Sequence, residues 1–147
     1  MSVLENDLDP NVFIGVSLPL GLSDDGFFEK TRKTVDQVKS NIRNLLLTQK
    51  GERLGNPTFG SNLRRVLFEP NTEDIEPAVE SAVREAIDEW LPFVSIASFN
   101  FERPINSNTI IMSITFNLDI DQTVATMDLD LGELAPVSEG TAVLGEY

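Results

Sequence analysis

The sequence predicts an α+β domain in which about three helices pack on one face of a small antiparallel sheet of about three to four strands. Apolar residues recur at three- and four-residue spacing between Thr34 and Trp90, which is typical of amphipathic helices. From Ile96 to Leu131 they recur at every second residue, which is typical of half-buried strands. The chain has 147 residues, of which 41% are apolar, so it is long enough to build one core.

The chain divides into an N-terminal arm of residues 1–33, a central domain of residues 34–131 and an acidic flexible tail of residues 132–147. Prolines and glycines interrupt the arm, and we expect its one apolar stretch, residues 12–22, to lie as an edge strand. The tail combines glycine and proline with acidic residues, a composition typical of mobile chain ends.

The first expected helix of the central domain runs from Thr34 to about Thr48. Thr34 with Gln37 resembles a capping box, and Gly51 supplies a stop after the last turn. The apolar face of this helix consists of Val35, Val38, Ile42, Leu45 and Leu46.

Two more helices are expected before the strands begin. After a loop of residues 51–60, Ser61 caps a short helix. Thr72 caps a third helix, which carries its apolar residues on one face and ends before Pro92.

Three strands are expected beyond Pro92. The first covers Ile96 to Phe101 and is joined by a hairpin connection to the second, Ile110 to Ile120, which has the clearest alternation. The third runs from about Thr123 to Leu131. We expect a partner strand to add to this strand at Ala125 and Met127. Asp128 and Asp130 are expected to protect the edge from indiscriminate pairing.

Several classes of site are excluded by composition. Without cysteine or histidine there is no thiolate nucleophile, no imidazole base and no zinc site with those ligands. No apolar run approaches the ~20 residues that a membrane span needs. Carboxylate pairs, a Ser/Lys dyad and Mg²⁺ or Ca²⁺ bound by carboxylates remain compatible with the composition. We nevertheless expect no catalytic, cofactor or metal site and no insertion into a membrane.

The charge of the chain is unevenly distributed. The net charge of −13 disfavours nucleic acid as a partner, yet residues 30–65 contain nine of the eleven basic residues. Such segregation suits ordered assembly, in which one charged region meets the opposite region of a neighbour. Simple solvation of surface charge is the alternative explanation.

The loop of residues 51–60 is the most informative segment. Glu52 and Arg53 place one carboxylate beside a rigid guanidinium with five donors, and Phe59 supplies an apolar plug between helices. Arg53 either pins the loop to a carboxylate or helix end, or also contacts another subunit. Lys50 is expected to be a solvated point charge by comparison.

The stretch from residue 45 to residue 71, LLLTQKGERLGNPTFGSNLRRVLFEPN, resembles the small baseplate wedge, or sheath-initiator, family of contractile phage tails. The family includes the lysozyme-like wedge subunit of T-even-type phages and is related to a type VI secretion baseplate subunit. The resemblance implies a structural protein of the virion tail baseplate, assembled in the host cytoplasm. The larger wedge subunits and the tail sheath protein are the implied partners, with tube or hub proteins as further candidates. The implied mechanism is nucleation of the sheath by strand addition.

Family members often carry a Glu-Pro-Arg triplet on the strand after the third helix. Here the corresponding residues are Glu102, Arg103 and Pro104, so arginine and proline are exchanged. The exchange moves the arginine by one pleat position. By this resemblance Glu102 and Arg103 are interface candidates, although the order of arginine and proline differs from that of the family.

Two alternative functions remain open. A muramidase needs two carboxylates at a defined separation, and Glu52, Glu69 and Glu102 are the candidates near apolar residues. A cytosolic anti-adaptor with the same fold is the other alternative, since fold alone does not define function. The sequence does not distinguish a phage from a secretion system or an extracellular injection device.

Overall fold

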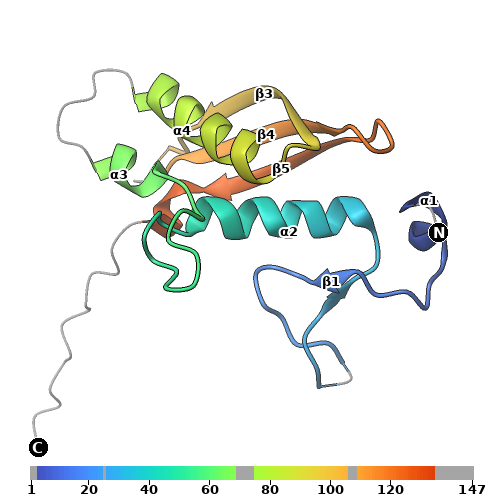
Figure 1. The fold of residues 1–147 in the computed structure, drawn as a ribbon. Coiled ribbons are helices and arrows are strands. Elements are labelled where there is room, and N and C mark those ends of the chain that lie inside the picture. Colours follow the sequence, from blue (N-terminus) through green and yellow to red (C-terminus); the bar gives the residue numbers. More distant parts are fainter. Residues whose placement is uncertain (1–2, 25, 69–74, 106–108, 135–147) are drawn as a thin grey trace, which may run out of the picture.

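The computed structural model describes residues 3–24, 26–68, 75–105 and 109–134. Its main body consists of a helical layer on one face of a three-stranded antiparallel sheet (Figure 1). The helices are α2 (Thr34–Leu47), α3 (Leu63–Phe68) and α4 (Ile75–Trp90), and the strands are β3 (Val94–Glu102), β4 (Ile111–Leu118) and β5 (Val124–Asp130). The predicted α+β architecture is confirmed.

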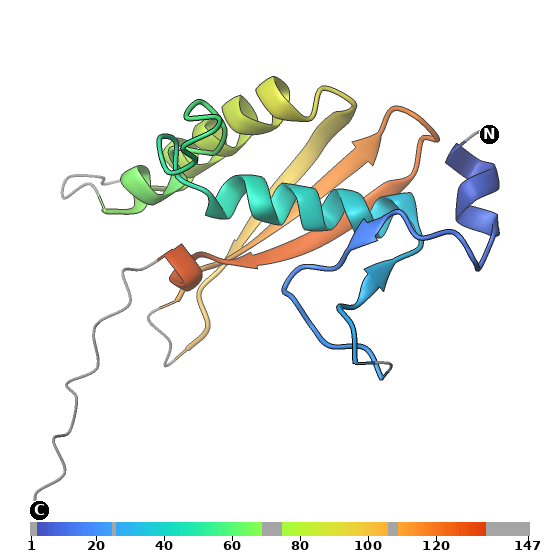
Figure 2. The ribbon, with the colours of Figure 1, turned by 60° about the horizontal axis from the view of Figure 1, so that its bottom comes forward.

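The sheet has the order β3-β4-β5, so β4 is central and both neighbours are edge strands, with β5 on the side opposite β3 (Figure 2). Met112, Ile114, Phe116 and Leu118 of β4 are almost completely buried, and the residues between them are more exposed. This is the predicted alternation. In β3 the pairing register shifts between Ile96 and Ser98, and this bulge brings Phe99 and Phe101 onto the core face.

The core lies between the helical layer and the sheet. Helix α2 contributes Val38, Ile42, Leu45 and Leu46, and α4 contributes Val79, Ala82, Val83, Ala86 and Ile87. Full burial of each of the larger aliphatic side chains stabilises the fold by roughly 1.5–3 kcal/mol relative to exposure. The two long helices are therefore fixed on the sheet by the residues that the helical spacing predicts.

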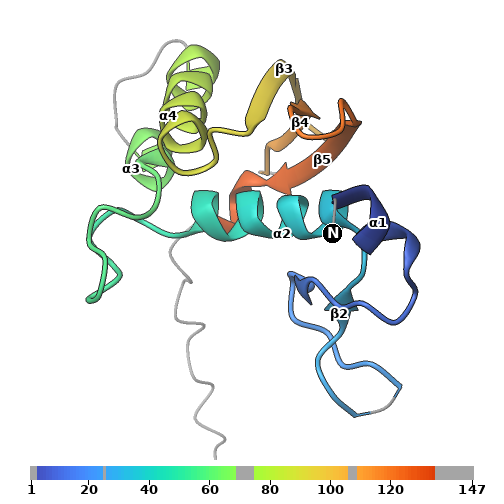
Figure 3. The same cartoon turned by 45° about the vertical axis from the view of Figure 1, so that its right-hand side comes forward.

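The N-terminal region differs from the expected irregular arm. It contains α1 (Val3–Leu8) and a separate two-stranded sheet of β1 (Gly15–Val16) and β2 (Lys30–Thr31), which projects from α2 on the side away from the main sheet (Figure 3). The apolar stretch of residues 12–22 is thus not an edge strand of the main sheet, because its backbone pairs locally with residues 28–31.

The start of α2 is capped from outside the helix. The carboxylate of Asp7 accepts hydrogen bonds from the backbone amide and the hydroxyl of Thr34. The capping box expected at Thr34 and Gln37 is therefore wrong, and Gln37 instead accepts a hydrogen bond from the hydroxyl of Thr31.

The packed region extends beyond the boundary expected after Leu131. Residues Leu131–Leu134 form the short 3-10 helix η1, in which Leu131 and Leu134 are buried in the core. Glu133 of this turn forms an ion pair with Arg43 of α2. Residues 135–147 of the expected tail lie outside the described residues. Among the helices that the structure describes, none is long and apolar enough to cross a membrane.

Candidate interaction surfaces

The loop after α2 is closed at its neck by backbone contacts. The amide of Ser61 donates to the carbonyl of Thr48 at 2.9 Å, and the amide of Lys50 donates to the carbonyl of Ser61 at 3.3 Å. Gly60 has a φ of 123°, and a Cβ there would lie 2.5 Å from the Thr48 carbonyl oxygen. Only glycine combines this backbone conformation with so close an approach.

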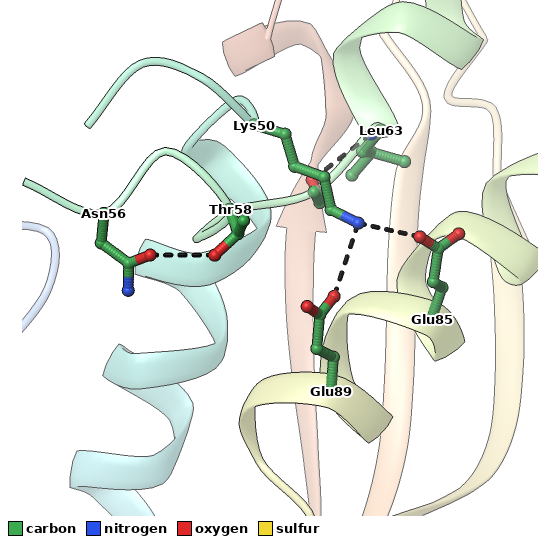
Figure 4. Close-up of polar contacts among 7 residues, drawn as sticks. Lys50, Asn56, Thr58, Leu63, Glu85 and Glu89 are labelled. Carbon is green, nitrogen blue, oxygen red and sulfur yellow. Dashed lines mark hydrogen bonds and ion pairs between the residues drawn. The ribbon is translucent and has the colours of Figure 1, made fainter. Parts of the chain in front are cut away.

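Within the loop, short-range hydrogen bonds define the shape. The amide of Gly51 donates to the carbonyl of Pro57 at 2.7 Å, and the hydroxyl of Thr58 donates to the side-chain oxygen of Asn56 at 2.9 Å (Figure 4). The carboxylate of Glu52 accepts a hydrogen bond from the amide of Gln49 at 3.1 Å. Glu52 therefore stabilises the loop from within.

Lys50 fastens the loop to α4. Its Nζ lies 2.8 Å from a carboxylate oxygen of Glu85 and 3.5 Å from one of Glu89, one helical turn away (Figure 4). The hydrogen bond to Glu85 raises the pKa of Lys50 above 10.5, and burial acts in the opposite direction. The expectation that Lys50 is a solvated point charge is wrong, because the loop neck directs its side chain onto an acidic face of α4.

Arg53 is at the exposed side of the same loop. Its guanidinium lies over the ring of Phe59 at 4.1 Å, and Phe59 meets Trp90 edge to face with ring centroids 5.2 Å apart. The Arg53 side chain forms no ion pair or hydrogen bond with the described residues. A guanidinium held by stacking keeps its in-plane donors available to a partner.

A hollow of about 240 Å³ adjoins this stack. The indole Nε1 of Trp90 is buried and has no hydrogen-bond partner within the described residues. An unpaired buried donor costs free energy. The hollow is lined by Asn41, Asn44, Leu45, Arg53, Phe59, Trp90 and Leu91.

Glu102 and Arg103 lie at the other end of α4. Arg103 forms an ion pair of 3.2 Å with Glu76 in the first turn of α4, whereas Trp90 is its last residue. The carboxylate of Glu102 accepts a hydrogen bond from the side-chain Nδ2 of Asn100 at 3.3 Å. The structure thus brings Arg53 and Phe59 together but places Glu102 and Arg103 at a separate surface.

The third expected surface is the free edge of β5. Leu118 donates to the carbonyl of Thr123, and Leu131 donates to that of Ile110. Along an antiparallel edge strand, amides that face the neighbouring strand (inward) alternate with amides that face the free edge (outward). These two bonds therefore define which amides of β5 face β4. The inward amides belong to Ala125, Met127 and Leu129, and the outward amides belong to Val124, Thr126, Asp128 and Asp130.

Ala125 and Met127 therefore do not present donors to a partner strand. Their side chains point into the core, where Met127 is 8% exposed. Asp128 has both an exposed side chain and an outward amide. The sequence correctly predicts that β5 is an edge strand. The selection of Ala125 and Met127 as the residues that pair with a partner strand is wrong, because their amides face β4.

Two of the three carboxylates considered for a muramidase lie in the described part of the chain. Glu52 and Glu102 are exposed and bonded locally. Neither lines the two hollows at the hairpin and along α2, the hollow beside Phe59 or the hollow between α3 and α4. Glu69 lies outside the described residues. No group of carboxylates in the described ranges is arranged to hold a metal ion.

Sequence reasoning missed the contributions of Lys50 and Trp90 to these surfaces. Glu85 and Glu89 carried a usable signal, because two acids four residues apart on an exposed helical face create a site for a cation. No local signal identifies the contact of Trp90 with Phe59, since the two residues come from different elements.

Residues 32–123 match the model of a protein family described as baseplate wedge protein gp25. The chain belongs to this family. It is accordingly a structural component of a baseplate, in association with other baseplate proteins. A structural baseplate family such as gp25 fits a protein that is not an enzyme.

Solved structures share the fold. A chain described as a tail lysozyme from Geobacter sulfurreducens has a TM-score of 0.61 and 21% identity, over 68% of this chain and 91% of that one. A chain of the anti-feeding prophage baseplate has a TM-score of 0.58 and 20% identity, over 71% of this chain and 83% of that one. No curated protein sequence matches the chain.

Proposed function

We propose that the chain joins the larger wedge subunits of the baseplate and nucleates the tail sheath by accepting a strand at the free edge of β5. The observation that carries the proposal is the row of outward amides at Val124, Thr126, Asp128 and Asp130. These amides have no hydrogen-bond partner in the described part of the chain. An added strand would supply the missing partners through its own backbone.

β5 is a better template than the other edge strand. Its seven residues pair with β4 without a shift in register, whereas β3 contains a bulge between Ile96 and Ser98. A bulge twists an edge and interrupts the regular spacing of its amides, which opposes pairing with a further strand. The intact edge is therefore the one that supports strand addition.

The side chains of β5 provide selectivity. Asp128 and Asp130 place two negative charges along the edge, which discourages pairing with an arbitrary strand. A partner strand with basic residues at the opposed positions would be accepted. On this proposal, the sheath strand carries lysine or arginine where it meets these residues.

The contact with the larger wedge subunits is assigned to the Arg53 and Phe59 surface. The stacked guanidinium offers donors in a fixed plane, which suits bidentate binding of a carboxylate. The adjoining hollow offers apolar walls from Leu45, Phe59 and Leu91. Glu102 and Arg103 form a second, separate candidate contact. Tube or hub proteins are further candidate partners.

The strand-addition proposal is tested with proline at two adjacent positions. Thr126→Pro removes an outward donor and leaves the ladder to β4 intact, so the domain should fold but start no sheath. Met127→Pro removes an inward ladder donor and should unfold the domain instead. Circular dichroism reports folding, and electron microscopy of particles complemented with each variant reports the sheath. Normal sheaths on particles with folded Thr126→Pro would show that the sheath attaches elsewhere.

A further inference from the structure

The hairpin of residues 14–31 exposes large apolar side chains to solvent. Leu20 and Leu22 are 62% and 77% exposed, and Phe27 is 71% exposed. Phe13 and Phe28 are about half exposed, and together with Phe27 they line a hollow of about 250 Å³. Apolar side chains gathered on a hydrogen-bonded element mark an interaction surface, because their exposure is otherwise unfavourable.

Cationic side chains border the same hollow. Lys30 Nζ and Arg32 Cζ lie 4.6 and 5.0 Å from the centre of the Phe13 ring. A second hollow of about 440 Å³ shares Lys30 and Arg32 and continues along α2 to Lys33 and Lys39. The two hollows are lined by four cationic residues and by the two anionic residues Glu29 and Asp36.

The cations of this surface have no carboxylate partners among the residues that the structure describes. None of Lys30, Arg32, Lys33 and Lys39 forms an ion pair within the described residues, although the chain has 24 acidic residues. Arg32 instead donates to the carbonyl of Pro10 at 2.6 Å. The surface therefore keeps a local positive charge on a chain of net charge −13.

The hairpin is held in a fixed position. A two-stranded hairpin alone is only marginally stable, but this one is bonded to α2. The amide of Leu18 donates to the hydroxyl of Ser40 at 3.2 Å, and the hydroxyl of Thr31 donates to Gln37. Gly15 lies directly against the side-chain amide of Gln37, which a Cβ at this position would displace. The apolar and cationic side chains are thus presented at a defined place.

We propose that this surface, defined by Phe13, Phe27, Phe28, Lys30 and Arg32, docks an acidic protein segment that carries apolar side chains. Apolar side chains of the segment fill the hollow between the phenylalanines, and its carboxylates pair with Lys30 and Arg32. The site goes beyond sheath nucleation, because the hairpin forms its own sheet, separate from β5. The net charge of −13 favours such a segment over the denser charge of a nucleic acid.

Binding in solution is tested with three labelled synthetic peptides, built from leucine and glutamate, serine and glutamate, or leucine and lysine. The full chain should bind the leucine-glutamate peptide about tenfold tighter than the other two by fluorescence anisotropy. The double change Phe27→Ser/Phe28→Ser, and separately Lys30→Ser/Arg32→Ser, should each weaken that binding about tenfold. Leu54→Ser, which changes a fully exposed residue on another loop, is the matched control.

The results that overturn the proposal are distinct. If the chain bound a single-stranded DNA oligonucleotide or phosphatidylserine vesicles more tightly than the leucine-glutamate peptide, the surface would belong to another class of partner. Equal binding of all three peptides would contradict the proposal. So would a loss of peptide affinity in Leu54→Ser as large as that in the two double variants. Thermal denaturation of each variant should match that of the parent chain, because the replaced side chains are exposed.

Assembled particles provide the second test. A photo-crosslinking benzophenone amino acid at Phe27 should attach to a stretch of another baseplate protein rich in acidic and apolar residues, located by mass spectrometry. Crosslinks to residues 135–147 of the same chain, or no crosslinks in particles that contain the protein, would contradict the proposal. Failure of sheath nucleation at β5 would not affect this result, because the crosslink reports only the hairpin.

Discussion

Asp7 and Thr34 lie 27 residues apart, and the carboxylate of Asp7 accepts hydrogen bonds from the amide and the hydroxyl of Thr34, at 2.9 and 2.8 Å. The contact satisfies a free amide at the start of α2 and joins α1 to the main domain. A carboxylate is also favoured there by the positive end of the helix dipole. The N-terminal region therefore contributes to the stability of α2 as well as carrying the proposed docking surface.

Asp7→Ala should lower the free energy of unfolding by about 1 kcal/mol, the usual effect of losing a helix cap. Urea denaturation followed by circular dichroism measures the change. Asp24→Ala is the control, because Asp24 is exposed and its side chain has no hydrogen bond in the described part of the chain. Equal stability of the two variants would show that Asp7 does not cap α2 in solution.

Gly60→Ala should destabilise the domain by about 1–3 kcal/mol, because a Cβ at a φ of 123° also approaches the Thr48 carbonyl. Gly55→Ala is a matched control on the same loop, where a Cβ meets no atom within 4 Å. Thermal denaturation compares the two variants. A Gly60→Ala variant as stable as Gly55→Ala would mean that the loop neck rearranges at little cost.

Lys50→Met should reduce stability near pH 7 by less than about 1 kcal/mol, because Glu85 and Glu89 are 58% and 46% exposed. The pKa of Lys50 is raised in the folded state, chiefly by the hydrogen bond to Glu85. The stabilisation is therefore complete below the ordinary pKa of 10.5 and is lost as the pH rises through the higher folded value.

Urea denaturation of the parent chain and Lys50→Met at neutral pH and well above pH 10.5 checks the sign. The difference between the two proteins should shrink at the higher pH. Lys39→Met, in the hollow along α2 and without an ion pair in the described residues, should show no such dependence. A constant difference for Lys50→Met would indicate that its effect comes from packing alone.

Much of the fold follows from periodicity because the core positions repeat locally. The spacing from Val38 to Leu46 places α2, and the alternation from Met112 to Leu118 places β4 with its buried face. Contacts between distant segments leave no such pattern. Neither the bond between Asp7 and Thr34 nor the small sheet of β1 and β2 is visible in local spacing.

The candidate surfaces were predicted less completely, for a physical reason that β5 illustrates. Alternation of side chains determines that Met127 faces the core, but the direction of its amide depends on the pairing register with β4. That register is a property of two strands. Similarly, the sequence identifies Arg53 and Phe59 as loop residues, while their stacking and the role of Lys50 require the position of α4.

Arg53→Ala should reduce incorporation of the chain into baseplates more than Lys50→Ala does, while leaving the isolated domain folded. Arg53 contributes no ion pair within the described residues, so its removal leaves no internal charge unpaired, whereas loss of Lys50 leaves Glu85 and Glu89 facing each other. Arg53→Lys should restore little, since a lysine has no planar fork to bind a carboxylate at two points. Quantitative mass spectrometry of purified particles measures incorporation, with circular dichroism as the folding control. Full incorporation of Arg53→Ala would remove this surface from the proposed wedge contact and leave Glu102 and Arg103 as the next candidates.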